Sequence, residues 1–143
     1  MRPTNELTLL LPSRSANESI ARVCVAGFAA QLDPTLEELG DIKTVVSEAV
    51  TNCIVHAYPD TIGEIKIRCR TFANGVLEIV ISDRGIGIPD IEKAREPMFT
   101  TGGEERSGMG FTIMESFSDS CIVRHRAGGG TVVKLSKRIE PRT

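Results

Sequence analysis

The sequence predicts an α+β domain, a two-layer sandwich with a mostly antiparallel sheet and helices on one face. Apolar residues recur at helical spacing in the first third of the chain, whereas later segments alternate apolar and polar residues, as strands with one wet face do. The Asn-Gly pair at 74–75 lies between two alternating segments and indicates a hairpin. With 143 residues, 41% hydrophobic and 25% charged, the chain is expected to be one domain spanning 1–143.

The first part of the chain contains one expected strand and two expected helices. Residues 7–11 form a short apolar run that predicts a strand. The segment 15–18, Ser-Ala-Asn-Glu, has the spacing of a capping box, and it predicts a helix that continues to about Gln31. A second segment of this form at 35–38, Thr-Leu-Glu-Glu, predicts a long helix that runs close to Ala57.

The remaining chain mixes strands with a glycine-rich region. Alternation predicts strands, and clustered Gly and Pro predict turns and loops. In order, we expect two strands within 63–82, a short helix at 89–94, an aperiodic loop at 95–107, a helix at 108–117 and two strands near 120–126 and 131–137.

Composition excludes several classes of protein. The formal charge is −2, Lys and Arg are scattered along the sequence and Trp is absent, which argues against a dedicated DNA or RNA surface. No signal segment or membrane-length apolar run is present, so we expect a cytoplasmic protein that does not bind membranes. The four cysteines show no paired C-x-x-C spacing, and we expect buried, reduced thiols.

Three polar residues, Glu48, Asn52 and His56, recur every four positions of the expected long helix. A step of four residues advances by about 400°, so the three side chains form one stripe. A solvated helix face explains most such stripes. Alternatively, the Asn52 oxygen can bind Mg²⁺, and Glu48, one turn earlier, can accept a proton from a hydroxyl group or water. We expect His56 to belong to the helix end.

The side of this helix opposite the polar stripe is apolar. It predicts a core face made of Val46, Ala49, Val50, Cys53 and Ile54.

The motif Asp83-x-Gly85-x-Gly87 follows an expected strand. The strand anchors the Asp83 carboxylate, and the glycines let the backbone bend behind it. A carboxylate held in a pocket can accept hydrogen bonds from an exocyclic amine such as that of adenine. The alternative is an aspartate that only caps the turn.

A second glycine motif, Gly108-Met109-Gly110, opens an expected helix. A helix N-terminus presents unpaired N–H groups, and glycine lets a phosphate approach them. The alternative is a glycine-rich start to an ordinary helix. Other phosphate motifs do not fit, because the chain has no G-x-x-x-x-G-K-[ST], no complete dinucleotide fingerprint and no H-R-D or D-F-G.

Taken in order, E-x-x-x-N-x-x-x-H-A, D-x-G-x-G and G-x-G resemble the motifs of the GHKL (Bergerat-fold) ATPases. The segments 47–52, 97–101 and 106–115 narrow this to a resemblance to the bacterial anti-sigma-factor serine kinases, most closely their sporulation anti-sigma-F members. The resemblance extends from about Asn5 to Lys137. It implies the Bergerat two-layer sandwich, with a nucleotide lid at about 95–107.

The resemblance also implies cofactors, partners and activities. It implies ATP or ADP with Mg²⁺, a homodimer, inhibition of a sigma factor of the sigma-F type, and ATP-dependent phosphorylation of a serine on an anti-anti-sigma partner. Glu48 is then the general base and Asn52 the Mg²⁺ ligand. Asp83 binds the adenine amino group with support from Gly85 and Gly87, and Thr131 lies beside it. The remaining implied contacts are phosphate-facing backbone at Gly108, Met109 and Gly110, and the end of the lid at Arg106 and Ser107.

The expected lid departs from the family pattern. Family members usually carry Lys and Pro after Phe-Thr-Thr, whereas residues 102–105 here are Gly-Gly-Glu-Glu. We therefore expect a looser lid that lacks one phosphate contact.

Two other functions fit parts of the pattern. One is an ATP-gated sigma-binding module with little kinase turnover, which would not need Glu48. The other is a detached histidine-kinase catalytic domain, but the chain has no dimerisation helix pair. On the first helix, Arg22 is a candidate contact for acidic partner groups.

Overall fold

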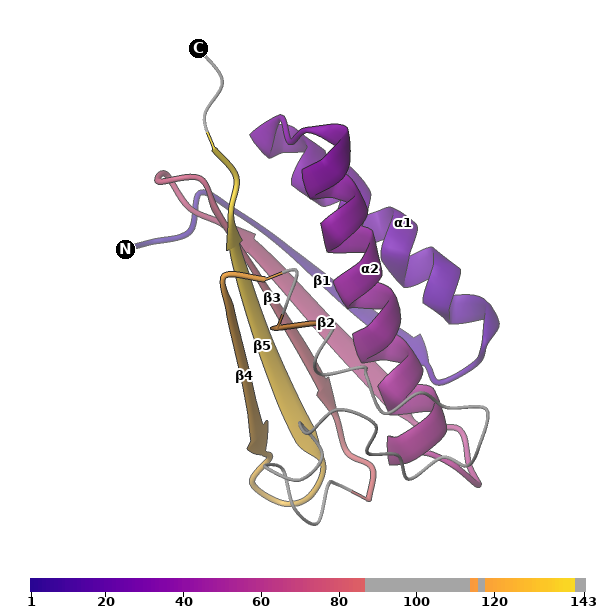
Figure 1. The fold of residues 1–143 in the computed structure, drawn as a ribbon. Helices are drawn as coiled ribbons and strands as arrows, with labels where there is room; N and C mark the ends of the chain where they lie inside the picture. The colour runs from indigo at the N-terminus through magenta and orange to yellow at the C-terminus, as the bar shows by residue number, and fades with distance from the viewer. Residues whose placement is uncertain (87–113, 116–117, 141–143) are drawn as a thin grey trace.

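The protein forms two layers, a five-stranded sheet and a pair of helices on one of its faces (Figure 1). The computed structural model describes residues 1–86, 114–115 and 118–140. In this part of the chain the strand order is β1-β2-β3-β5-β4, and every neighbouring pair is antiparallel. The predicted α+β sandwich with helices on one face is therefore confirmed.

The strands agree with the predicted alternating segments. β2 and β3 are joined through Gly75, which has φ +84° and would bring a Cβ to 2.8 Å from the Ile139 carbonyl oxygen, so only glycine fits this turn. β4 and β5 are joined by three glycines with positive φ, at 128–130. The bounds are β1 Asn5–Pro12, β2 Glu64–Thr71, β3 Val76–Asp83, β4 Ser120–His125 and β5 Thr131–Arg138.

The first helix, α1 (Ala16–Ala29), continues into a short 3-10 turn, η1 (Ala30–Leu32). The capping box predicted at 15–18 is wrong. Ser15 has φ −54° and ψ −37°, a helical conformation, whereas a capping residue is extended, and its side chain makes no capping hydrogen bond. Glu18 instead lies 3.8 Å from Arg22, one turn further on.

The second helix, α2 (Leu36–Asn52), begins at the predicted capping box. The Thr35 hydroxyl accepts a hydrogen bond from the Glu38 amide at 3.0 Å, and the Glu38 carboxylate accepts one from the Thr35 amide at 2.8 Å. After Asn52 the helix widens into a π-turn, η2 (Cys53–Ala57), in which the Tyr58 amide donates to the Cys53 carbonyl at 3.1 Å. The predicted extent to about Ala57 is confirmed, but the last turn is not α-helical.

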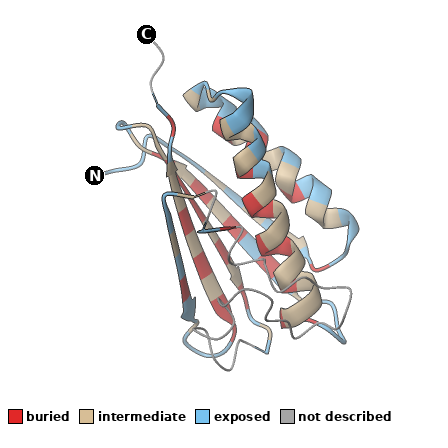
Figure 2. Cartoon of the chain, viewed as in Figure 1, coloured by how far each residue is buried: buried red, intermediate tan, exposed pale blue. Residues whose placement is uncertain are grey.

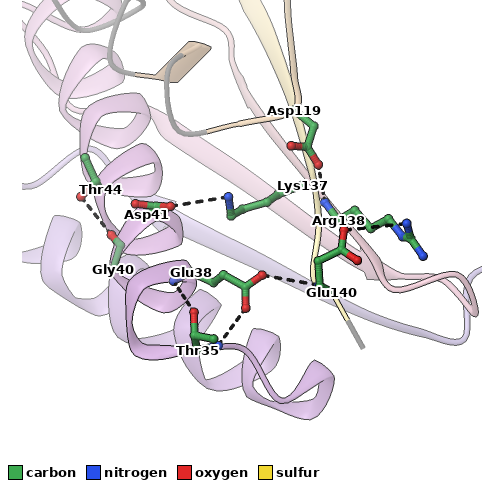
Figure 3. Close-up of polar contacts among 9 residues, drawn as sticks. All are labelled: Thr35, Glu38, Gly40, Asp41, Thr44, Asp119, Lys137, Arg138 and Glu140. Carbon is green, nitrogen blue, oxygen red and sulfur yellow. Dashed lines mark hydrogen bonds and ion pairs between the residues drawn. The ribbon is translucent and has the colours of Figure 1, made fainter. Parts of the chain in front are cut away.

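Polar contacts fasten the first turns of α2 to the end of β5 (Figure 3). The Lys137 ammonium lies 3.5 Å from the Asp41 carboxylate, and both side chains are largely shielded from solvent. The Glu140 amide donates to Glu38 at 3.5 Å, so one glutamate both caps the helix and contacts the chain after β5. This attachment fixes α2 across the sheet at the end where the helix begins.

The core lies between the helices and the sheet (Figure 2). The predicted core face of α2 is confirmed for Val46, Ala49, Val50 and Cys53, which are buried, and Ile54 packs against them half-buried. Facing positions of the sheet are also fully buried, and the largest of them are Ile65, Ile67, Leu77, Ile81 and Leu135.

All four cysteines are free thiols, as predicted. Cys53 and Cys69 are buried, but Cys24 and Cys121 are only half-buried, so the expectation that all four are buried is wrong. The apolar neighbours in sequence of these two cysteines do not bury them, because Cys24 lies on α1 and Cys121 lies on the edge strand β4, where less of the chain covers a side chain.

Two of the predicted elements lie outside the described residues, namely the helix at 89–94 and the loop at 95–107. Of the helix predicted at 108–117, Met114 and Glu115 are described, and both are helical. No helix in the described ranges is long and apolar enough to cross a membrane.

Removing the α2 cap is predicted to destabilise the protein. Thr35→Ala deletes the hydroxyl that accepts from the Glu38 amide, and such a loss typically costs about 1 kcal/mol. The matched control is Ser15→Ala, which removes no capping hydrogen bond and should change the free energy of unfolding by less than about 0.5 kcal/mol. Urea denaturation measures both values, and equal losses at the two positions would contradict the assignment.

Candidate functional site

The predicted site residues that the structure describes gather where α2 and β3 end (Figure 1). Asp83 is the last residue of β3, Asn52 is the last of α2, and Thr131 is the first of the neighbouring strand β5. Both α2 and β3 run toward this end of the molecule, so their polar terminal residues follow long buried stretches.

The Asp83 carboxylate is the centre of this site and is 6% exposed. Its Oδ1 accepts hydrogen bonds from the Gly85 amide at 3.0 Å and from the Thr131 amide at 3.3 Å, and its Oδ2 accepts one from the Cys53 thiol at 3.7 Å. Burial raises the pKa of Asp83 above its ordinary value, although the amides of Gly85 and Thr131 act in the opposite direction. A carboxylate has about four acceptor positions, so this one can accept a further hydrogen bond from a ligand.

Two glycines allow the chain to close around Asp83. A Cβ on Gly85 would overlap the Ala57 carbonyl group, and the next amide, of Ile86, donates to that carbonyl at 3.1 Å. A Cβ on Gly130 would overlap the Asp83 carbonyl oxygen. Gly85 was predicted for this site. Gly130 was not, because the glycine run 128–130 indicates a turn between two strands but not its contact with β3.

Cys53 is a site residue that sequence reasoning placed only in the core. Burial, followed by the nearby negative charge of Asp83, raises the pKa of the Cys53 thiol well above its ordinary value, so the group is a neutral donor. Its partner lies 30 residues further along the chain, and no local pattern pairs the two.

Tyr58 is the second residue that the sequence did not indicate. Its hydroxyl accepts from the Arg84 amide at 2.7 Å and donates to the Glu64 carbonyl at 2.7 Å, so it joins the turn after β3 to the start of β2. Burial raises the pKa of Tyr58, which keeps the phenol protonated. It is the only tyrosine of the chain and follows the π-turn directly, which is the one signal available in the sequence.

Glu48 and Asn52 lie one turn apart near the end of α2, and both are half-buried. Among the residues that the structure describes, the Glu48 carboxylate makes no hydrogen bond or ion pair, so it is available to a ligand. His56 lies in the π-turn η2, as expected of a helix-end residue.

The donor set fits Mg²⁺ rather than a metal held mainly by protein. Within the described ranges, no three His, Cys, Asp or Glu residues are grouped to hold a metal ion. Mg²⁺ is commonly bound by one or two protein oxygens, with water and phosphate groups completing its shell. The Asn52 amide oxygen, one turn after the Glu48 carboxylate, is a hard oxygen of this kind.

The other predicted site residues lie outside the described residues. These are Gly87, Arg106, Ser107, Gly108, Met109 and Gly110. The structure therefore brings together Asp83, Gly85 and Thr131, and places Glu48 and Asn52 on the last turns of the neighbouring helix.

Comparison with known proteins supports the same class of site. Residues 11–137 match the family model of the histidine kinase-like ATPase domain. Two relatives are each named Anti-sigma F factor. The one from Geobacillus kaustophilus is 55% identical over 139 residues, which are 94% of this chain and 93% of the relative. The one from Caldanaerobacter subterraneus subsp. tengcongensis is 54% identical over 140 residues, 97% of each chain.

Solved structures share the fold at low sequence identity. The structure of the RsbU and RsbW domains of a Mycobacterium tuberculosis protein matches 96% of this chain and 32% of its own, with a TM-score of 0.69 and 19% identity. The catalytic domain of the histidine kinase ThkA matches 97% of this chain and all of its own, with a TM-score of 0.56 and 18% identity. The family model and the close relatives extend over almost the whole chain, which therefore belongs to the histidine kinase-like ATPase domain family and, within it, to the group of anti-sigma F factors.

Proposed function

We infer that this protein is an anti-sigma factor that binds and inhibits a sporulation sigma factor of the sigma-F type. We further infer that it is an ATP-dependent serine kinase that phosphorylates and inactivates an anti-anti-sigma partner. The observation that carries the enzymatic part is the Asp83 carboxylate, buried yet able to accept one more hydrogen bond, at the same end of the molecule as a half-buried Glu48 without a described partner. The name of the close relatives supports the sigma-factor part.

Asp83 is suited to bind adenine. An adenine amino group donates hydrogen bonds, and Asp83 is an acceptor whose orientation is fixed by two amides and a thiol. Because the Cys53 thiol is neutral, it does not repel the carboxylate. A guanine base offers a carbonyl oxygen at the corresponding position, which a carboxylate would not bind, so we expect a preference for ATP and ADP.

Glu48 is suited to act as the general base. ATP bound with Mg²⁺ supplies the phosphoryl group, and Asn52 would hold the metal through its amide oxygen. Glu48 accepts the proton of the serine hydroxyl as that oxygen bonds to phosphorus, and ADP departs with the electrons of the broken phosphoanhydride bond.

Two expectations concern protein partners: one comes from family membership and the other from a residue on α1. We expect a homodimer in the cytoplasm, and Arg22 on α1 remains the candidate contact for acidic partner groups. Its guanidinium lies 3.8 Å from Glu18, and with 40% of the side chain exposed this pair is weak enough to be exchanged for a partner carboxylate.

Glu48→Gln is predicted to abolish phosphate transfer while ATP binding is kept. The amide has the same shape but cannot accept the proton, and general-base catalysis contributes about 10²–10⁴-fold to a rate. Labelled ATP and a purified anti-anti-sigma protein measure transfer to serine, and calorimetry measures ATP affinity. The matched control is Glu37→Gln on the exposed face of the same helix, which should leave the rate unchanged.

Two results would contradict this account. Normal transfer by the Glu48→Gln protein would remove Glu48 as the base. No transfer by the unmodified protein, together with ATP-dependent sigma binding, would show a nucleotide-gated binding module instead of a kinase.

Asp83→Asn is predicted to weaken ATP binding in a protein that remains folded. The variant keeps the oxygen that accepts from Gly85 and Thr131 but replaces the other oxygen with a donor group. Loss of a hydrogen bond to a charged group costs about 1.5–3 kcal/mol, or roughly 10–100-fold in affinity. Calorimetric titration with ATP tests this part.

The stability of the Asp83→Asn protein should depend on pH in a defined direction. The folded-state pKa of Asp83 is raised, so its contribution to stability is fully present below its ordinary pKa and is lost as pH rises through the raised value. The variant has no ionisable group at position 83 and therefore lacks this loss. The difference between its melting temperature and that of the unmodified protein should shift in favour of the variant from acidic to neutral pH. A melting temperature that falls relative to the unmodified protein at neutral pH would contradict the assignment.

A further inference from the structure

The sheet has a second face that the helices do not cover, and it carries a groove. Period-two alternation places Ile65, Ile67 and Cys69 toward α1 and α2, and the residues between them toward the opposite side. No described helix covers this outer face (Figure 1). A hollow of about 360 Å³ lies there, and its apolar residues are Leu10, Val80 and Val132.

Four cations surround this hollow, which we call the outer-face groove. They come from three different strands or their ends: Lys66, Arg68, Arg84 and Arg126. Two carboxylates also line the groove: Glu64, and Asp83, which accepts hydrogen bonds from Cys53, Gly85 and Thr131 and interacts with the charge of Arg126. The groove is therefore positively charged, although the chain as a whole has a formal charge of −2.

The charge in the outer-face groove is not neutralised within the described part of the protein. Lys66 and Arg84 make no ion pair with another described residue. Arg68 lies 3.7 Å from Glu6, but both side chains are at least 40% exposed, so the pair contributes little. The folded chain thus leaves a cluster of cations available to a partner.

Two other cations on the same face are paired. Arg70 and Lys134 both contact the carboxylate of Glu78, whose side chain is 10% exposed. These two contacts outweigh the effect of burial and lower the pKa of Glu78, which keeps it charged. The contrast with Lys66 and Arg84 shows that this surface can hold carboxylates between its cations.

One row across the sheet at the groove contains both apolar and cationic side chains. The strand pairing aligns Leu10, Lys66, Ser82, Val132 and Arg124 in one row. With neighbouring strands about 4.8 Å apart, the row spans roughly 19 Å. Leu10 is 58% exposed and lies in this row beside Lys66, so a partner can reach an apolar and a cationic side chain together.

We propose that the outer-face groove binds an acidic segment of a partner protein that carries apolar side chains between its carboxylates. The carboxylates pair with Lys66 and Arg84, and the apolar side chains cover Leu10 and Val132. Complementary charge also increases the association rate, because the positive face stands out on an otherwise negative chain.

Two other occupants fit the surface less well. A second copy of this chain docked groove against groove would bring two positively charged surfaces together, which costs free energy. A nucleic acid would leave Leu10 and Val132 uncovered and would meet the Glu64 carboxylate, and no aromatic side chain among the described residues lines the groove for base stacking.

The outer-face groove adjoins the nucleotide site at Asp83, but its cations and apolar residues lie on the other face of the sheet from α2. Glu48 and Asn52 lie on α2, which packs on the opposite face of the sheet. The proposal therefore does not depend on kinase activity, and it can be tested without ATP.

The test uses a short fluorescein-labelled peptide that alternates glutamate and leucine, at an ionic strength of about 0.1 M. Fluorescence anisotropy should show saturable binding that weakens at least about tenfold with the Lys66→Glu/Arg84→Glu protein. The matched control is Arg14→Glu/Lys43→Glu, which makes the same charge change at exposed positions outside the groove and should leave binding unchanged. Thermal unfolding of each variant establishes that it is folded.

Further measurements test the contribution of apolar contacts to binding and distinguish the alternative occupants of the groove. A peptide that alternates glutamate and serine should bind at least about fivefold more weakly, and Leu10→Ser should remove most of that difference. The proposal is overturned if both peptides bind equally, or if the control variant loses as much affinity. It is also overturned if duplex DNA binds more tightly than the peptide, or if the groove variant changes only the oligomeric state.

Discussion

The arrangement of the site depends on one buried carboxylate and the groups that hold it. Asp83 ends β3, and it accepts hydrogen bonds from the end of α2 through Cys53, from its own turn through Gly85 and from β5 through Thr131. Burying a charge is costly unless its acceptor positions are satisfied, so these three elements must meet at this point. The remaining acceptor capacity is what a ligand can use.

The two ends of α2 have different tasks, and their structures differ accordingly. At the first end, the capping box and the contact between Asp41 and Lys137 fix the helix on the sheet (Figure 3). At the second end, the π-turn brings the Ala57 carbonyl to the Ile86 amide and leaves no room for a side chain at position 85. Single π-turns are often found at functional sites, because they adjust the direction of a few residues without ending the helix.

Local patterns predicted the elements well, and they failed where the outcome depends on distant residues. The Asn-Gly turn, the strand alternation and the Thr35 cap each follow from chemistry within a few positions. The segment at 15–18 has the same spacing as the one at 35–38, but Ser15 is already helical in the folded chain, so spacing alone could not distinguish the two. The conformation of Ser15 depends on the path of the chain after β1, and the four residues at 15–18 do not determine that path.

The site residues that the sequence indicated are those that share a local motif. Asp83 and Gly85 were indicated because they are close in sequence and share a motif. Cys53 and Tyr58 were not, because a thiol in an apolar run and a lone tyrosine gain their roles only when β3 is placed beside the π-turn. Family resemblance supplied Thr131, whereas the local sequence had no means to place it next to Asp83.

The alternation of strand β3 connects the nucleotide site with the outer-face groove. Asp83 points to the side of the helices and contacts Cys53, whereas Ser82 and Arg84 line the outer-face groove. A shift of one residue in the pairing with β2 would exchange these faces, and it would put a charged arginine in the core in place of Asp83. The buried apolar face and the Asn-Gly turn oppose such a shift, and the Tyr58 hydroxyl adds to this by bonding the Arg84 amide and the Glu64 carbonyl, each at 2.7 Å. Both surfaces depend on this register, because it sets the direction in which the Asp83 carboxylate and the Arg84 side chain point.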